Sequence, residues 1–148
     1  MTALYWVVLA MMLRLSPSDD PIVRHGALAV AIATVVTDEN PVFAGDDSRE
    51  RTSALIVAVA FRESSLNASI TGDGGHSVCA MQIYNGGQAL NEDPIACIRR
   101  GLSMIRTSIR VDRENPIAFY ARGPRWATEG ARRISRDRMA LARKLVTR

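Results

Sequence analysis

Glu63 is the residue whose type and position most clearly point to chemistry. It lies two positions after residues 54–61, a stretch without a polar side chain. A carboxyl group at the end of a buried segment is partly removed from water, which disfavours its charged form and raises its pKa. A general acid that works near neutral pH needs this shift, because it must hold a proton before it donates one. The alternative is an exposed glutamate paired with Arg62 or another arginine.

A glycine-rich turn follows this carboxyl group. Residues 72–77 read Gly-Asp-Gly-Gly-His-Ser and lie 9 to 14 positions beyond Glu63. Such a turn lets the backbone approach a ligand closely, and a hairpin would fold it back over Glu63. It is not a phosphate-binding P-loop, because no Gly-Lys-Ser/Thr follows. Ser77 also lacks the Gly-x-Ser-x-Gly setting of a nucleophilic serine.

Four short motifs, in this order, resemble the soluble lytic transglycosylase and goose-type lysozyme superfamily. They are Glu63-Ser64-Ser65, the turn 72–77, Ala80-Met81-Gln82-Ile83 and Phe119-Tyr120-Ala121-Arg122-Gly123. The family signature is Glu-Ser, a glycine-bearing turn with serine, Gly-Leu-Met-Gln and a later Ala-Tyr-Asn-Ala-Gly, and the match covers about residues 50–125. Cys79 and Ala80 replace the usual glycine and leucine, and Ala121 replaces the asparagine. These departures affect substrate detail more than reaction type, because Glu63 is intact.

The resemblance implies a role for each matching residue. Glu63 would be the catalytic acid and then the base. Ser77 and Gln82 would form hydrogen bonds to sugar groups, and Met81 would line the wall of the cleft. Tyr120 would place its hydroxyl near Glu63 and help to orient it, since a phenol offers a donor and an apolar ring together. Core packing is the alternative for Met81 and Tyr120.

The implied reaction is cleavage of peptidoglycan between N-acetylmuramic acid and N-acetylglucosamine, without cofactor or metal. A lytic transglycosylase uses one glutamate and leaves a 1,6-anhydro end. Hydrolysis is the alternative, in which Asp73 would position water as a second carboxylate, although an aspartate between glycines is more often a turn residue. We prefer transglycosylation, because no other acidic residue occupies a comparable place. A non-catalytic wall-binding or virion protein of the same fold is a further alternative.

The two cysteines, Cys79 and Cys97, lie 18 positions apart. We hypothesise a disulfide that ties the Met-Gln segment to the following helix, worth about 3 kcal/mol by loop-entropy arguments. Two buried free thiols are the alternative. A zinc site with His76 lacks an obvious fourth ligand nearby in the sequence.

The positive charge lies almost entirely on arginine. The net charge is +4, and Lys144 is the only lysine. The last predicted helix carries one acid, Asp137, against seven basic residues, which are Arg132, Arg133, Arg136, Arg138, Arg143, Lys144 and Arg148. We expect a solvated basic face that attracts anionic wall polymers or peptide-stem carboxylates beside the glycan strands, and weakens in salt. No nucleic-acid partner is expected, because interleaved aromatics, helix-turn-helix and zinc-finger spacings are absent; we expect a monomer.

The elements that would position these residues are helices separated by strong breaks. Their predicted starts are Asp20-Pro21, a capping box of Asp47 and Glu50, Asp93-Pro94, Asn115-Pro116 and about Ala131. Two apolar stripes follow helical spacing, namely Ile95, Ile98, Leu102, Ile105 and Ile109, and then Ile134, Leu141, Ala142 and Leu145. Strand-like alternation is sparse. The predicted fold is mainly α, a lysozyme-like helical domain with at most a small β-hairpin near residues 70–85.

The N-terminal segment, residues 1–20, is set apart from the transglycosylase-like domain expected over residues 21–148. Its apolar run ends before Arg14, which is shorter than the ~20 residues that span a bilayer. It also lacks the positive n-region of a secretory signal. A buried first helix is the preferred interpretation, and an atypical signal or anchor is the alternative. The implied substrate places the action in the cell envelope, periplasmic or extracellular, and would suit a phage product equally.

Overall fold

The computed structural model describes residues 1–147, and Arg148 of the predicted basic helix lies outside the described residues. Its helices are α1 (Ala3–Leu15), α2 (Pro21–Asp38), α3 (Ser48–Ser64), α4 (Ala89–Glu92), α5 (Pro94–Val111), α6 (Ala118–Arg122) and α7 (Glu129–Val146), with 3₁₀ turns η1 (Asp73–Gly75) and η2 (Gly123–Arg125). The strands are β1 (Thr71–Gly72), β2 (Ser77–Val78) and β3 (Ile83–Tyr84). The predicted fold class, mainly α with a small hairpin, is confirmed.

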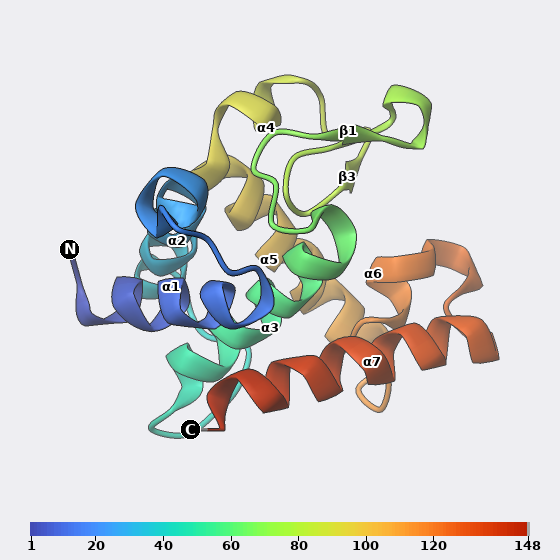
Figure 1. Cartoon of the computed structure of the whole chain (residues 1–148). Coiled ribbons are helices and arrows are strands. Elements are labelled where there is room, and N and C mark those ends of the chain that lie inside the picture. Colours follow the sequence, from blue (N-terminus) through green and yellow to red (C-terminus); the bar gives the residue numbers. More distant parts are fainter. Residues whose placement is uncertain (148) are drawn as a thin grey trace.

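Helix α3 runs through the middle of the molecule, with α1 and α2 on one side and α7 on another (Figure 1). Every residue from Thr52 to Ala60 is buried. A helix that is apolar on all sides must be covered on all sides, so the sequence of α3 makes it the axis of the core. Its last turn, which carries Glu63, emerges beneath the β-sheet.

The predicted helix starts at Asp20 and Asp93 are confirmed. Oδ1 of Asp20 accepts a hydrogen bond from the amide of Val23 at 3.1 Å, and Oδ1 of Asp93 accepts one from the amide of Ala96 at 2.9 Å. Each aspartate is followed by a proline in the first turn. These caps satisfy amides that have no partner inside the helix.

Helix α3 begins at Ser48, directly after Asp47 as predicted, but without the predicted capping bonds, and α6 and α7 begin at other residues than predicted. Asp47 makes no capping hydrogen bond and lies 3.7 Å from Arg51 instead, so the capping box with Glu50 is not formed. Helix α6 begins at Ala118, later than Asn115-Pro116, because residues 112–115 form a turn around the Asp112 carboxylate. Helix α7 begins at Glu129, where the hydroxyl of Thr128 caps the amide of Ala131 at 3.2 Å.

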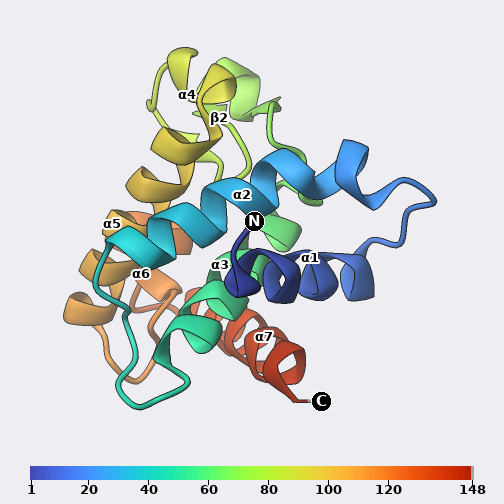
Figure 2. The same ribbon diagram turned by 90° about the vertical axis from the view of Figure 1, so that its left-hand side faces the viewer.

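The N-terminal helix α1 packs into the same core as the rest of the chain. Tyr5, Val8, Leu9, Met11 and Met12 are buried against α2 and α3. Arg14 donates hydrogen bonds to the carbonyls of Lys144 and Leu145 at 2.8 and 2.9 Å, so the end of α1 meets the end of α7 (Figure 2).

Helix α2 is long and apolar enough to cross a membrane by length and composition, with a mean hydropathy of 1.2. Half of its residues are buried inside the protein. The core helix of a soluble protein gives the same pattern, so α2 says little about localisation.

The antiparallel sheet is small and is fastened to the helices by side chains. Gly72 pairs with Ser77, and Ser77 pairs with Tyr84 on the other side. The amide of Asn91 bridges the sheet, since it accepts from the backbone of Cys79 at 2.7 Å and donates to the hydroxyl of Thr71 at 3.2 Å.

The predicted disulfide is confirmed. Cys79 and Cys97 are bonded, with their Cα atoms 6.3 Å apart. The bond joins the segment after β2 to the first turns of α5, and both sulfur-bearing residues are buried. The sheet therefore has a covalent attachment to the helical body.

Candidate active site

A groove of about 950 Å³ lies between the β-sheet, α5 and the α6–η2 segment. Its lining combines Glu63, Asp73, Ser77, Gln82 and Tyr120, for which the sequence predicts roles, with other residues. Phe119 and Arg122 belong to the last motif but had no predicted role, and Tyr84, Arg100, Met104 and Arg125 lie outside the motifs. In Figure 1 the sheet lies above α6. Residues that are remote in the sequence therefore meet in one concave site.

Glu63 lies in the last turn of α3 at the wall of the groove, and 24% of its side chain is exposed. Its pKa is raised above the ordinary 4.5, first because burial disfavours the charge and then because Asp73 adds negative charge nearby. Arg138, whose guanidinium lies 3.6 Å away, acts in the opposite direction through its positive charge. The negative end of the α3 dipole also disfavours an anion at this position. The carboxyl group therefore has the raised pKa that the sequence predicts.

Arg138 is the ion-pair partner of Glu63, and the prediction that it lies on a solvated basic face is wrong. Its Nη2 lies 3.6 Å from Oε1 of Glu63, and only 16% of its side chain is exposed. Asp137 holds it, since Nη1 of Arg138 lies 3.0 Å from Oδ2 of Asp137. A signal was present in the spacing: position 138 is four residues after Ile134 and four before Ala142, on the buried stripe of α7.

The glycine-rich turn brings Asp73 to the groove and uses Ser77 to hold it. The hydroxyl of Ser77 donates to Oδ2 of Asp73 at 2.5 Å. Ser77 is 2% exposed, so its role differs from the expected sugar contact: it fixes the aspartate. Asp73 is exposed and has a φ of 50°, a conformation that aspartate tolerates better than most residues.

Gln82 lines the groove but directs its amide nitrogen into the protein. Nε2 donates to the carbonyls of Cys79 at 3.0 Å and Ile70 at 3.3 Å. Oε1 lies directly against Gly72, where a larger residue would collide with it. The amide thus ties the sheet together, and the side-chain carbonyl is the part left for a ligand.

Met81 does not line the groove wall, and the structure corrects that expectation. It is fully buried, and its side chain packs on Gly101 of α5, where any Cβ would lie within about 3 Å of it. The carbonyl of Met81 accepts a hydrogen bond from the hydroxyl of Tyr120 at 2.5 Å. Core packing, the alternative interpretation, describes Met81.

Tyr120 lies near Glu63, but its hydroxyl donates to Met81 rather than to the carboxyl group. Its pKa is raised well above 10, first by burial and then by the charge of Glu63. The backbone amide of Tyr120 donates to the buried hydroxyl of Ser108 at 2.9 Å, and that of Ile117 donates to Ser135 at 2.9 Å. Two buried serines thus fix α6 between α5 and α7.

Within residues 1–147 no cluster of three or more histidine, cysteine, aspartate or glutamate side chains is arranged to hold a metal ion. The disulfide occupies both sulfur atoms of the considered zinc site, and His76 stacks on Tyr84 with ring centroids 5.7 Å apart. The chemistry available in the groove is that of a partly buried acid beside hydrogen-bonding and aromatic groups.

Comparison of the chain with models of protein families, with curated proteins and with solved structures gave no match.

Proposed function

We propose that this protein cleaves the glycan strands of bacterial peptidoglycan as a lytic transglycosylase, with Glu63 as acid and then base. The observation that carries the proposal is the meeting of Glu63, Asp73, Gln82 and Tyr120 in one groove. These positions come from separate motifs of the resemblance, and nothing in their local sequence requires them to converge. The groove volume of about 950 Å³ lies within the range of about 300–1,000 Å³ typical of ligand sites.

The backbone at Cys79 gives independent support to the resemblance. Cys79 stands where the family signature has glycine, and its φ is 61°. This left-handed region strongly favours glycine. Position 79 thus has a backbone conformation that suits the glycine of the signature, although the residue here is a cysteine bonded to Cys97 of α5.

In the proposed reaction the protonated carboxyl group of Glu63 donates to the glycosidic oxygen as the bond to C1 of N-acetylmuramic acid breaks. The substrate's acetamido group stabilises the positive charge on the sugar. The carboxylate of Glu63 then takes the proton from the 6-hydroxyl, whose oxygen bonds to C1. The product is a 1,6-anhydro end, Glu63 regains its proton, and no water is consumed. Arg138 would stabilise the carboxylate between the two steps, since its guanidinium lies 3.6 Å away.

Hydrolysis is the second candidate, because Asp73 lines the same groove and its charge raises the pKa of Glu63. A second carboxylate near the acid is the arrangement that positions water in inverting glycosidases. The bond from Ser77 leaves Asp73 able to accept further hydrogen bonds.

Mass spectrometry of digested peptidoglycan sacculi tests both candidates. We expect wild-type protein to release anhydro ends, lighter by one water than reducing ends, and E63Q to lose about 10²- to 10⁴-fold in rate. D73N should still form anhydro ends, and E114Q, at an exposed glutamate outside the groove, should match wild type. Inert wild-type protein, or E63Q with full activity, would reject glycan cleavage by Glu63. Reducing ends that disappear in D73N would favour hydrolysis.

The disulfide supports action in the cell envelope, periplasmic or extracellular. Structural disulfides persist in oxidising compartments and are rare in the cytosol. Cys79 and Cys97 are buried and bonded, which fits a wall substrate outside the cytosol.

A further inference from the structure

The groove is lined by both acidic and basic side chains. Glu63 and Asp73 provide the acidic part, and Arg100, Arg122 and Arg125 provide the basic part. The proposed reaction uses Glu63, with Asp73 nearby, and assigns nothing to the arginines. A neutral polysaccharide would need no cation in the groove.

The three arginines have no ion-pair partner in the described part of the chain. Among residues 1–147 none of them forms a salt bridge, and none donates a side-chain hydrogen bond to another residue. Arg99, the neighbour of Arg100, lies 3.3 Å from Glu39. The chain therefore pairs the arginine that points away from the groove and leaves the groove arginine exposed.

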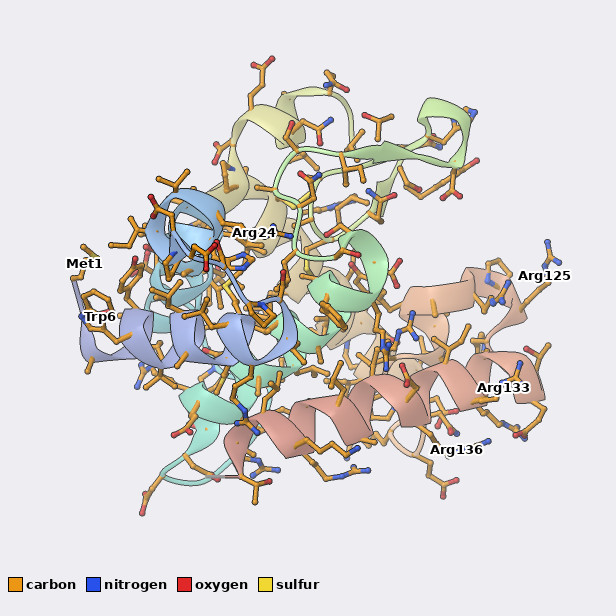
Figure 3. The ribbon with its side chains drawn as sticks, viewed as in Figure 1. Met1, Trp6, Arg24, Arg125, Arg133 and Arg136 are labelled. Carbon is orange, nitrogen blue, oxygen red and sulfur yellow. A yellow bond between two sulfur atoms is a disulfide. The ribbon has the colours of Figure 1, made fainter. Side chains whose placement is uncertain are left out.

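The three side chains come from three elements, of which α6 and η2 follow each other directly in the chain. Arg100 lies on α5, whereas Arg122 ends α6 and Arg125 ends η2. Figure 3 shows Arg125 at the end of the molecule, on the side of the β-hairpin, with Arg133 and Arg136 below it on α7. Arginines from α5 and from the α6–η2 segment at one groove are placed to meet a single extended ligand.

We infer that Arg100, Arg122 and Arg125 form a carboxylate-binding subsite, so that the groove selects glycan strands that carry acidic substituents over uncharged N-acetylglucosamine polymers. The guanidinium group matches a carboxylate with two parallel hydrogen bonds, which gives orientation as well as attraction. This inference rests on the proposed function for the glycan and adds its substituent. The carboxylate has two sources, the lactyl group of N-acetylmuramic acid and the peptide stem.

Binding measured by calorimetry tests the subsite without turnover, in the E63Q background. The probes are chitohexaose, which has no carboxylate, a hexasaccharide of alternating N-acetylglucosamine and N-acetylmuramic acid, and the same hexasaccharide with peptide stems. The test variant adds R122Q and R125Q. The control adds R132Q and R133Q, which remove the same charge from exposed positions of α7 outside the groove.

We expect the E63Q protein to bind carboxylate-bearing probes more tightly than chitohexaose. R122Q/R125Q should reduce that preference about five- to tenfold, as for two exposed ion pairs, and leave chitohexaose binding unchanged. The control should keep the preference, and 0.5 M salt should remove it by screening. A preference already complete without peptide identifies the lactyl group, and one that needs peptide identifies the stem; both support the subsite.

Three results would overturn the subsite. The first is equal binding, or no binding, of all three probes. The second is an equal loss in the test and control variants. The third is displacement of the hexasaccharide by an equal concentration of a single-stranded oligonucleotide, which would assign the arginines to phosphate. Cleavage of sacculi by wild-type protein is measured separately. Cleavage without carboxylate selectivity would contradict only the subsite, and carboxylate selectivity without cleavage would contradict only the proposed reaction.

Discussion

Nη2 of Arg138 lies 3.6 Å from Oε1 of Glu63, across the contact between α7 and α3. The same two helices are joined beside it by Arg62 and Asp137, whose side chains are 3.0 Å apart. Asp137 also holds Arg138 at 3.0 Å. The four residues form one charge network, so the packing of α7 on α3 sets how strongly Glu63 holds its proton.

Replacement of Arg138 should extend activity to higher pH. Arg138 lowers the pKa of Glu63 against the larger effect of burial, so R138Q should raise that pKa further. A general acid acts in its protonated form, and the rate falls as pH rises through its pKa. The alkaline limb of kcat/KM should therefore move upward in R138Q and stay in place in R133Q. A limb that moves down, or does not move, would contradict a proton-donating Glu63 coupled to Arg138.

The raised pKa of Glu63 should also make the free energy of unfolding depend on pH. The pKa of Glu63 is raised in the folded protein, so the unfolded chain ionises first as pH rises, and the wild type loses stability between the two pKa values. Glutamine stays neutral. In urea unfolding, the free energy of unfolding of E63Q relative to that of the wild type should increase from pH 4 to pH 8. Glu129, whose pKa is lowered first by its hydrogen bond from Arg136, is the opposite case: E129Q should not gain over this range. Parallel curves for E63Q and wild type would contradict the burial of Glu63.

Local signals predicted the helices better than they predicted the site. Asp20 and Asp93 precede prolines, and the capping bond is made within three residues, so neighbouring residues contain the information. Asp47 also directly precedes a helix, but its carboxylate lies near Arg51 and caps no amide. The sequence offers Asp47 both a backbone amide and an arginine as partners, and it does not show which of them the folded chain uses.

The sequence predicts a groove residue when a local motif contains it. It does not predict a partner that tertiary packing brings from a distant helix. Glu63 was found because its own helix buries it. Arg138 is 75 positions away and reaches Glu63 only because α7 crosses α3. The family resemblance predicts Met81 at the wall beside Gln82, but the structure buries Met81 while Gln82 lines the groove, at a turn where Gln82 has a φ of 48°.

The disulfide should account for a large share of stability. Closing the loop between Cys79 and Cys97, 18 positions apart, restricts the unfolded chain and is worth about 3 kcal/mol. Reduction should lower the free energy of unfolding by that amount, measured in urea with and without a reductant. A C79A/C97A variant should show no response to the reductant. An unchanged unfolding midpoint of the wild type after complete reduction would contradict a stabilising role.

Gly101 connects the core to the groove. Its missing side chain leaves the space that Met81 fills, and the carbonyl of Met81 accepts the hydroxyl of Tyr120 at 2.5 Å. Tyr120 in turn lies close enough to Glu63 for the carboxylate charge to affect its pKa. A displacement of Met81 should therefore change the environment of Glu63, although Gly101 is buried beneath the groove.

A methyl group at position 101 should separate packing from helix propensity. Its Cβ would lie 2.7 to 3.1 Å from atoms of Met81, and such overpacking costs about 1–3 kcal/mol. G101A should lower the free energy of unfolding by that amount and reduce sacculus cleavage, because Tyr120 loses its fixed acceptor. Gly130 on α7 has no atom within 4 Å of a built Cβ, so G130A should gain up to about 1 kcal/mol from helix propensity with unchanged activity. Equal stability changes in the two variants would mean that Met81 moves aside without cost. The proposed coupling from Gly101 through Met81 and Tyr120 to Glu63 would then be contradicted.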